Sequence, residues 1–410
     1  MIDKEISVFQ HCYRCLLRGM LIIHYLLLKL FKLIPHQPKK TKQLTILATG
    51  TFYSDHWLIT HLRPMANADT CKHLTMVAST SVPNMNKVSG EYAPKWLSKV
   101  FGQVVARLIY FTWLAITQRP DVLVGFHLLL NGLLVVVLAK LIGAKSVYIC
   151  GGGPREVDGG GFNTESRIFN RIGKADSFIE KMLIKSVNEM DLVISMGTSA
   201  IRYFKDKGVK TIFEIVPGGF DDSVFCPRPE VKKQYDLILV GRLSEVKRVD
   251  RFLKSIQISK KQLPHLNAVI VGDGPDKEKL QKLAIELGIA DDVYFAGWQN
   301  NVEYWLQQSR CFVLTSDSEG LSQALIQAMM CGAPAITSKV GDLGDLIEEG
   351  VNGYLSDFLT EHEFATGYIN IFSCKNKLDT FSEAAYQSTE KFSISEVSQH
   401  WHKIYATFSN

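Results

Sequence analysis

Residues 311–334 constrain the fold most, because they combine an apolar run, a polar turn and a helical pattern. The run 311–314 predicts a buried parallel strand. The turn contains Glu319, and Gly320 lets the backbone approach a ligand closely. Apolar residues then recur at helical spacing until Gly332 and Pro334 end the pattern. A strand, a carboxylate-bearing turn and a helix N-terminus favour an anionic ligand that carries hydroxyl groups.

Three upstream segments repeat the combination of an apolar run and a glycine turn. They are residues 237–248 with Gly241, 269–275 with Gly272, and 293–298 with Gly297. In this order and spacing, the four segments resemble family 4 of the glycosyltransferases, which transfer a sugar from a nucleotide donor. The resemblance is close over residues 210–356 and looser over 44–210. It implies an α/β protein of the GT-B fold, with two Rossmann-like domains that face a central cleft.

The resemblance also implies how a donor is held. Breaking a sugar–nucleotide bond places negative charge on the departing diphosphate, which the protein has to stabilise. Arg242 and Lys247 match the family's phosphate-binding pair, and Glu319 matches a glutamate that accepts hydrogen bonds from the donor sugar. We therefore expect these three residues to be catalytic. The other expected donor-binding residues are Gly241, Gly272, Gly297, Trp298 beside the base, Gly320, Leu321, Ser322 and Gln327.

Gln327 departs from the family's pattern, because it stands where a second glutamate is usual. In the family that carboxylate accepts hydrogen bonds from the ribose hydroxyls. Glutamine has the same length and keeps a carbonyl acceptor, but it has no negative charge. We therefore expect weaker donor binding with catalysis retained.

The first half of the chain carries a fourth expected catalytic residue, His127, and three acceptor or loop candidates, which are Gly50, Arg155 and Glu156. Gly50 follows the first predicted strand and matches a flexible glycine loop of the family, although the usual doubled glycine is absent. His127 follows the buried strand 121–126, at the end where α/β proteins bind ligands, and it matches a family position that contacts the acceptor or the transferred sugar. Arg155 and Glu156 lie between two glycine triplets that suggest a mobile lid. Many family members have a histidine-bearing loop there instead.

The resemblance implies transfer with retention of anomeric configuration, with the donor phosphate taking the acceptor's proton. That route requires no protein nucleophile, and we assign none. No Asp-x-Asp motif follows a strand to hold a divalent metal against the diphosphate. We therefore expect a metal-independent protein with no cofactor, whose donor is a substrate.

The N-terminal segment differs in charge from the rest of the chain. Residues 1–43 hold eight Lys or Arg and two acidic residues, and the remainder holds 38 basic and 39 acidic residues. A leucine-rich helical pattern covers residues 11–34, but its uncharged stretch is too short to span a bilayer. One narrow arc of this helix collects five polar residues, which are Arg14, Arg18, Tyr25, Lys29 and Lys32.

We expect this helix to lie in a membrane interface, with Lys39, Lys40 and Lys42 adding attraction to anionic lipid. The alternatives are a helix packed on the body, a self-association face and a tilted span. A cleaved signal peptide is disfavoured because no small-residue cleavage site follows.

The sequence as a whole suggests three parts and one principal function. The parts are a membrane-associated segment (1–43), an acceptor domain (44–225 with the terminal helix 393–410) and a donor domain (226–392). The expected function is retaining hexosyl transfer from a nucleotide sugar to a glycan or lipid-linked acceptor in polysaccharide or glycolipid biosynthesis. The alternatives are a nucleotide-sugar epimerase of the same fold and a non-catalytic nucleotide-sugar-binding protein, which Gln327 would favour.

The expected surroundings follow from composition. Eight cysteines without framework spacing fit a reducing compartment, so we expect a cytoplasmic protein attached peripherally to the inner face of the cell membrane. The near-neutral body gives no sign of nucleic-acid binding.

Overall fold

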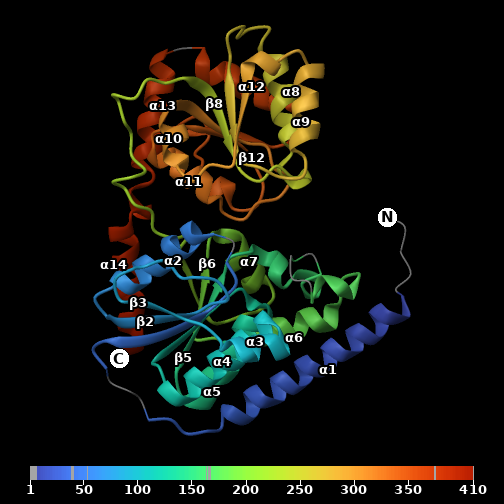
Figure 1. Cartoon of the computed structure of the whole chain (residues 1–410), viewed down its shortest axis with the longest axis vertical. Coiled ribbons are helices and arrows are strands. Elements are labelled where there is room, and N and C mark those ends of the chain that lie inside the picture. The colour runs from blue at the N-terminus through green and yellow to red at the C-terminus, as the bar shows by residue number, and fades with distance from the viewer. Residues whose placement is uncertain are drawn as a thin grey trace. The chain divides into compact units, whose positions relative to one another are not determined.

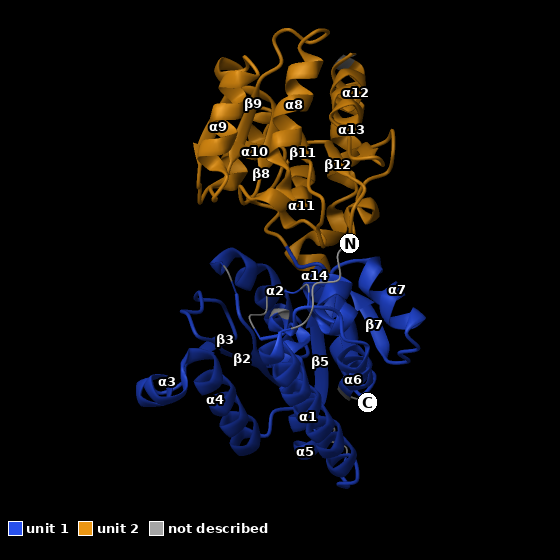
Figure 2. Ribbon diagram, turned by 90° about the vertical axis from the view of Figure 1, so that its right-hand side faces the viewer, with its two compact units in different colours: residues 1–219, 397–410 blue, residues 220–396 orange. Residues whose placement is uncertain are grey.

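The computed structural model describes residues 7–37, 41–52, 54–162, 164, 168–373 and 375–409. The chain forms two compact units, residues 1–219 with 397–410 (unit 1) and residues 220–396 (unit 2), which Figure 2 colours separately. The boundary that the sequence suggests, between residues 225 and 226, lies a few residues later. The N-terminal helix, expected to be a separate segment, is part of unit 1. Lys39 and Lys40 lie outside the described residues.

Unit 1 is built on a parallel sheet of seven strands in the order β3-β2-β1-β4-β5-β6-β7 (Figure 1). The strands are β1 (Leu44–Thr49), β2 (Cys71–Val77), β3 (Val88–Glu91), β4 (Val122–Phe126), β5 (Lys145–Cys150), β6 (Leu192–Ser195) and β7 (Ile212–Ile215). The helices are α1 (Val8–Phe31), α2 (Asp55–Asn67), α3 (Lys95–Phe101), α4 (Gln103–Gln118), α5 (Leu133–Ile142), α6 (Ser177–Val187), α7 (Thr198–Asp206) and most of α14 (Ile394–Ser409). Gly102, whose φ is +77°, separates α3 from α4.

Unit 2 contains a parallel sheet of six strands in the order β10-β9-β8-β11-β12-β13. The strands are β8 (Tyr235–Val240), β9 (Ala268–Val271), β10 (Val293–Gly297), β11 (Ser309–Leu314), β12 (Ala335–Ser338) and β13 (Gly353–Ser356). The helices are α8 (Val249–Ser259), α9 (Lys277–Glu286), α10 (Val302–Gln307), α11 (Gln323–Met330), α12 (Glu361–Phe372) and α13 (Lys375–Gln387). Both units therefore have the predicted Rossmann-like architecture.

Apolar runs such as residues 311–314 form strands that are buried on both faces. In β11, Phe312 and Leu314 pack into one core of unit 2, while Cys311 and Val313 pack into the core on the opposite side of the sheet. Successive side chains of a strand point to opposite faces, so a strand between two helix layers has to be apolar at every position. This is why these strands appear as unbroken apolar runs.

In each sheet the strand order reverses direction once. The reversal lies between β1 and β4 in unit 1 and between β8 and β11 in unit 2. At such a point the loops that follow the two strands lead to opposite sides of the sheet and leave a crevice at its carboxyl edge. Gly50 and His127 follow β1 and β4, and the segments with Lys247 and Glu319 follow β8 and β11.

The helix α1 packs on the rest of unit 1 through its polar arc. Arg14 Nε and Arg18 Nη2 donate to Asp176 Oδ2 over 2.8 and 2.9 Å, and Lys32 Nζ donates to Glu189 over 2.9 Å. Leu17 and Leu21 are buried beside the arginines. The cations expected to face lipid headgroups therefore face the protein, because Asp176 and Glu189, which flank α6, lie opposite them. None of the described helices combines the length and apolar character needed to cross a bilayer.

Asp176 has two structural roles. Its Oδ1 accepts the Phe178 and Ile179 N–H groups and so caps α6, while its Oδ2 accepts both arginines of α1. Burial acts to raise the pKa of this carboxyl, but the Ile179 N–H and the two guanidinium groups lower it below its ordinary value of 3.8.

We predict that Asp176→Ala destabilises the protein by about 3 kcal/mol, because it leaves Arg14 buried without its counterion and removes a helix cap. The pair should contribute fully above pH 3.8, and its contribution should be lost as the pH falls through the lowered native pKa. Urea unfolding across this pH range, together with hydrogen exchange of the α1 amides, measures both effects. Glu189→Ala is the matched control and should lose much less, because Lys29 and Lys32 are exposed. Equal losses in the two variants would contradict this assignment.

Candidate functional site

The turns after β8, β9 and β10 of unit 2 approach one another so closely that glycine is required. A Cβ on Gly272, whose φ is +140°, would lie 1.9 Å from the Gly241 carbonyl oxygen. The Gly272 N–H donates to the Gly297 carbonyl over 2.8 Å. The three glycines singled out in the sequence therefore meet at one edge of the sheet, where the backbone is open to a ligand.

Lys247 and Glu319 meet at the switch point of unit 2. Lys247 Nζ lies 2.6 Å from Glu319 Oε1, and the Ser316 hydroxyl donates to the same oxygen over 2.6 Å. The two charged side chains come from the loops after β8 and β11, which are 72 residues apart in sequence. Both are mostly buried, so their charges interact in an environment that screens them weakly.

Backbone contacts join the same two loops. The Thr315 hydroxyl donates to the carbonyls of Lys247 and Arg248, and the Asp317 N–H donates to the Val246 carbonyl over 2.9 Å. These bonds fix the distance between the candidate phosphate-binding turn and the candidate sugar-binding turn. The fold therefore holds the two turns together and keeps Lys247 and Glu319 within reach of each other.

The sequence did not single out the cluster formed by Arg248, Arg251 and Asp317. Arg251 Nη1 donates to the Thr315 carbonyl over 2.6 Å, and its Nη2 donates to Asp317 over 2.8 Å. Burial raises the pKa of Asp317, but Arg251 and Arg248 outweigh burial and lower it. Through these contacts, Arg248 and Arg251 hold the loop after β11 in place. Arg251 occupies a buried position of α8, but the sequence does not show which residues it contacts.

The remaining donor-side candidates differ in exposure. Arg242 is exposed at the end of β8 and has no ion pair within the described part of unit 2. Trp298 is also exposed, and its indole N–H donates to Asn300. Ser322 caps α11 by accepting the Leu325 N–H, as the helical pattern predicted. Gln327 is only 6% exposed within α11.

In unit 1, His127 and Glu156 form the centre of a second polar site. His127 has a φ of +63°, and its Nδ1 lies 2.9 Å from Glu156 Oε1. Glu156 is buried, and its carboxylate also accepts hydrogen bonds from the Leu128 and Gly152 N–H groups and from the Tyr148 hydroxyl. Burial acts to raise the pKa of Glu156, but His127 and the other donors lower it. Because an ionised carboxylate only accepts, Nδ1 of His127 carries the proton.

The sequence placed Glu156 on a mobile lid, and in the structure it is instead buried beneath His127. Arg155, its neighbour, is exposed and donates to the Gly152 carbonyl within the same loop. The sequence therefore identified both residues but not the difference in their roles. Burial of one and exposure of the other follow from the short helical turn Gly153–Glu156, which directs them to different sides.

Arg107 is a buried residue of this site that the sequence did not single out. Its guanidinium donates to the carbonyl of Gly50, to the Thr51 hydroxyl over 3.1 Å and to Asn131 Oδ1 over 2.9 Å. Burial lowers the pKa of Arg107 to about 10, so it is charged at neutral pH. It holds the glycine loop after β1 in place. A lone arginine inside an otherwise apolar, acid-free helix was the available signal.

No group of three or more His, Cys, Asp or Glu side chains that could hold a metal ion occurs among the residues with described placement.

Part of this chain is similar to a known protein family. Residues 225–388, less than half of the chain, match the family model described as glycosyl transferases group 1. The N-acetyl-alpha-D-glucosaminyl L-malate synthase of Bacillus anthracis is 26% identical over 56% of this chain and 63% of its own length. The poly(glycerol-phosphate) alpha-glucosyltransferase of Bacillus subtilis is 25% identical over 54% of this chain and 33% of its own length. The chain thus covers less than two thirds of each of these relatives.

Solved structures establish the fold. The crystal structure of HepE from Anabaena in complex with UDP covers 89% of this chain and all of its own, with a TM-score of 0.67 and 17% identity. The prediction of the GT-B fold is confirmed.

We predict that Glu156→Gln changes the tautomer of His127, because the amide can also donate and no longer forces the proton onto Nδ1. The loss of a charge-assisted network should also cost about 2 kcal/mol of stability. Long-range ¹H–¹⁵N NMR of the imidazole identifies the tautomer, and Arg155→Gln, on the exposed neighbour, is the control. An unchanged Nδ1–H signal in Glu156→Gln would show that this carboxylate does not set the state of His127.

Proposed function

We propose that this protein is a metal-independent retaining glycosyltransferase that moves a hexosyl group from a nucleotide sugar to a glycan or lipid-linked acceptor. The observation that carries the proposal is the Lys247–Glu319 pair at the switch point of unit 2, with Arg242 exposed on the same turn. An ammonium and a guanidinium at this edge provide donors for a diphosphate, and the carboxylate provides acceptors for sugar hydroxyls. Donor entry then exchanges the internal pair for contacts with the substrate.

The charge that develops in the reaction explains this choice of residues. As the sugar–phosphate bond breaks, negative charge grows on the departing diphosphate, next to Arg242, Lys247 and the N-terminus of α11. These groups provide positive charge without a divalent ion, which supports the proposal of metal independence. No protein nucleophile is required when a donor phosphate oxygen takes the acceptor's proton on the face that the sugar leaves, and this gives retention.

The similar proteins support the substrate class. The two relatives are by name an N-acetylglucosaminyl-malate synthase and a poly(glycerol-phosphate) glucosyltransferase, and the HepE structure contains UDP. UDP is therefore the first nucleotide to test. We place the reaction in polysaccharide or glycolipid biosynthesis, on the cytoplasmic side of a cell membrane, where nucleotide sugars would be available to unit 2.

His127 is the candidate contact for the transferred sugar or the acceptor. Glu156 fixes the orientation of the imidazole by accepting from Nδ1, so Nε2 is the nitrogen of a neutral ring that can accept a hydrogen bond from a substrate hydroxyl. Gly50 is itself buried, and its carbonyl is where Arg107 holds the loop after β1. In this scheme Glu156 and Arg107 are positioning residues, and they do not touch the substrate.

One observation favours a second candidate function, a protein that binds a nucleotide sugar without transferring it. Gln327 replaces the family's second carboxylate and would weaken the hold on the ribose. Binding without transfer in a screen of acceptors would support this function, whereas turnover of the donor without any acceptor would support an epimerase.

We predict that Arg242→Ala and Lys247→Ala each lower kcat/KM by about 30- to 1,000-fold, equivalent to about 2–4 kcal/mol of transition-state stabilisation. Initial rates with a radiolabelled nucleotide sugar and a membrane extract as acceptor measure the loss. Lys282→Ala removes an exposed cation of α9 and should leave the rate unchanged. Full activity in both site variants would refute the phosphate-binding assignment.

We also predict that Gln327→Glu tightens UDP binding about fivefold, since a hydrogen bond to an ionised acceptor gains about 1 kcal/mol over a neutral one. Gln327→Ala should weaken binding, and Glu319→Ala should cost far more activity than either change. Titration calorimetry with UDP gives the affinities, and initial rates give the activities. The same UDP affinity in Gln327→Glu and wild type would remove the ribose assignment.

A further inference from the structure

The face of α1 that points away from unit 1 is apolar. Leu16, Met20, Ile23, Leu27 and Leu30 are all exposed and recur every three or four residues, so they form one continuous stripe. Ile23 is 60% exposed. The polar arc of the same helix is bound to Asp176 and Glu189. The helix is thus oriented with its charges toward the protein and its hydrocarbon toward solvent.

A second apolar stripe runs along α4 and continues onto α3. Val105, Ile109, Trp113 and Ile116 lie on one side of α4 and are exposed. Trp113 is 55% exposed, and Trp96 on α3 is 65% exposed. Exposed apolar residues scattered singly are ordinary, but two adjacent stripes are a patch of the kind that marks an interaction surface. We call the two stripes with Trp96 the apolar face.

The charge pattern of this face has one sign. None of α1, α3 and α4 contains an aspartate or a glutamate, although the protein has 41 such residues. Lys95 and Lys99 are exposed beside Trp96, and within the described residues neither has an ion-pair partner. An acid-free apolar face with lysines and tryptophans at its margin is complementary to an anionic lipid surface.

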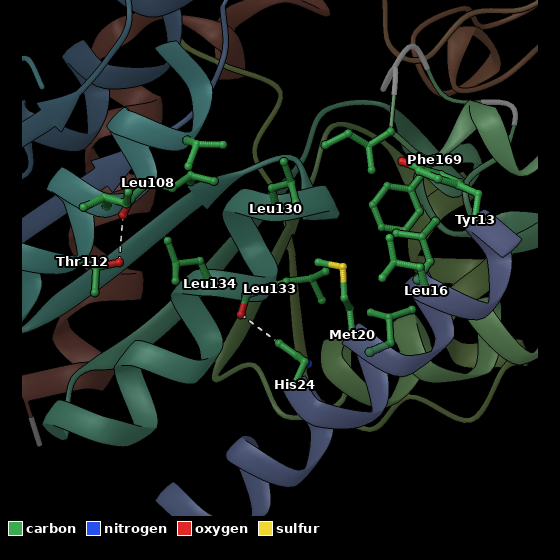
Figure 3. A pocket seen from close by; sticks show the side chains of 15 residues that line it. Tyr13, Leu16, Met20, His24, Leu108, Thr112, Leu130, Leu133, Leu134 and Phe169 are labelled. Carbon is green, nitrogen blue, oxygen red and sulfur yellow. Dashed lines mark hydrogen bonds between the residues drawn. The ribbon is translucent and has the colours of Figure 1, made fainter. Parts of the chain in front are cut away.

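A groove opens through the apolar face between α1 and α4 (Figure 3). It has a volume of about 470 Å³. Its rim includes Leu16, Met20 and Ile109, which are exposed, and its floor includes Leu133 and Phe169, which are buried. The groove therefore leads from the exposed face into the core of unit 1, and its size is within the range of pockets that hold small ligands.

In the groove, the side chains of His24 and Thr112 already have hydrogen-bond partners. His24 Nε2 is bonded to the Leu133 carbonyl over 2.9 Å, and the Thr112 hydroxyl donates to the Leu108 carbonyl over 2.8 Å. Burial lowers the pKa of His24 more than the Leu133 bond raises it, so this wall is neutral at pH 7. Except at the Tyr13 hydroxyl, an occupant with polar groups would lose its hydration here without compensation, whereas a hydrocarbon chain would lose nothing.

We propose that the apolar face docks unit 1 on a membrane of anionic phospholipids, and that the groove between α1 and α4 takes one hydrocarbon chain of a lipid from that membrane. The helix α1 then lies in the interface, fastened to the protein by Asp176 and Glu189. Lys95 and Lys99 reach the headgroups, and Trp96 and Trp113 occupy the boundary between headgroups and chains. This inference is independent of the proposed transfer reaction.

A second copy of the chain is a poorer occupant. A two-fold interface places the same patch on both sides, so Lys95 and Lys99 would find no carboxylate on the facing copies of these three helices. A bilayer provides hydrocarbon to both stripes and phosphate groups to the lysines at the same time.

The docking is tested by flotation of the full-length protein with vesicles of phosphatidylcholine, with and without phosphatidylglycerol. Wild type should float with the anionic vesicles, and Ile23→Glu or Trp113→Glu should weaken partitioning by at least about tenfold. Ile285→Glu on α9 is the matched control, because Ile285 is 68% exposed and lies outside the face. Circular dichroism and UDP affinity verify that each variant is folded. The proposal would be overturned if wild type remained in the bottom fraction, or if Ile285→Glu lost vesicle binding as much as Ile23→Glu and Trp113→Glu.

The groove is tested separately by photo-cross-linking to phosphatidylglycerol that carries a diazirine in one acyl chain. Peptides from α1 and α4 should be labelled, and Leu108→Trp, which fills the groove, should lose that label while flotation persists. Labelling elsewhere, or unchanged labelling in Leu108→Trp, would refute the hydrocarbon site. If wild type bound no vesicles but dimerised in size-exclusion chromatography with light scattering, and Ile23→Glu abolished the dimer, the face would be assigned to a second copy.

Discussion

The parallel arrangement of the strands determines where everything else in this protein lies. All strands of a parallel sheet end at one edge, so the loops that follow them are collected there irrespective of their separation in sequence. At the point where the strand order reverses, two of these loops diverge and leave a crevice between them. Both sheets have this reversal, and in both the candidate residues lie at it. In unit 2 it brings Lys247 within 2.6 Å of Glu319.

Buried charged groups fix the loops around these crevices. Arg107 holds the loop after β1, Glu156 holds His127, and Arg251 holds the loop after β11 through the Thr315 carbonyl and Asp317. A buried charge is costly unless it is paired, so each of these groups tolerates few alternative conformations of its partners. The result is a set of side chains that are positioned before any ligand arrives, which is the condition for electrostatic stabilisation of a developing charge.

Unit 1 uses the same physics for a different purpose at α1. An amphipathic helix ordinarily buries its apolar stripe and exposes its charges. In α1 the charged arc faces the protein instead, because Asp176 and Glu189 pair with four cations of the helix. Leu17, Leu21 and Leu28 still bury part of the hydrocarbon. The remaining apolar stripe is left exposed beside that of α4, and the groove between them follows from this arrangement.

The sequence by itself determined the elements and their chemistry. Unbroken apolar runs predicted β1 and β4 of unit 1 and β8 to β11 of unit 2, and the helical pattern that ends at Gly332 predicted α11, because these patterns are local properties of the sequence. The motif order predicted the GT-B fold and selected Lys247, Glu319 and His127, whereas Glu156 was singled out by the two glycine triplets around it. The orientation of α1 was not readable, since its arc of cations fits lipid headgroups as well as it fits carboxylates 157 or more residues away. The partner of Glu156 and the roles of Arg107 and Arg251 were equally hidden. Each depends on contacts between segments distant in sequence, and only the tertiary structure decides which charges meet.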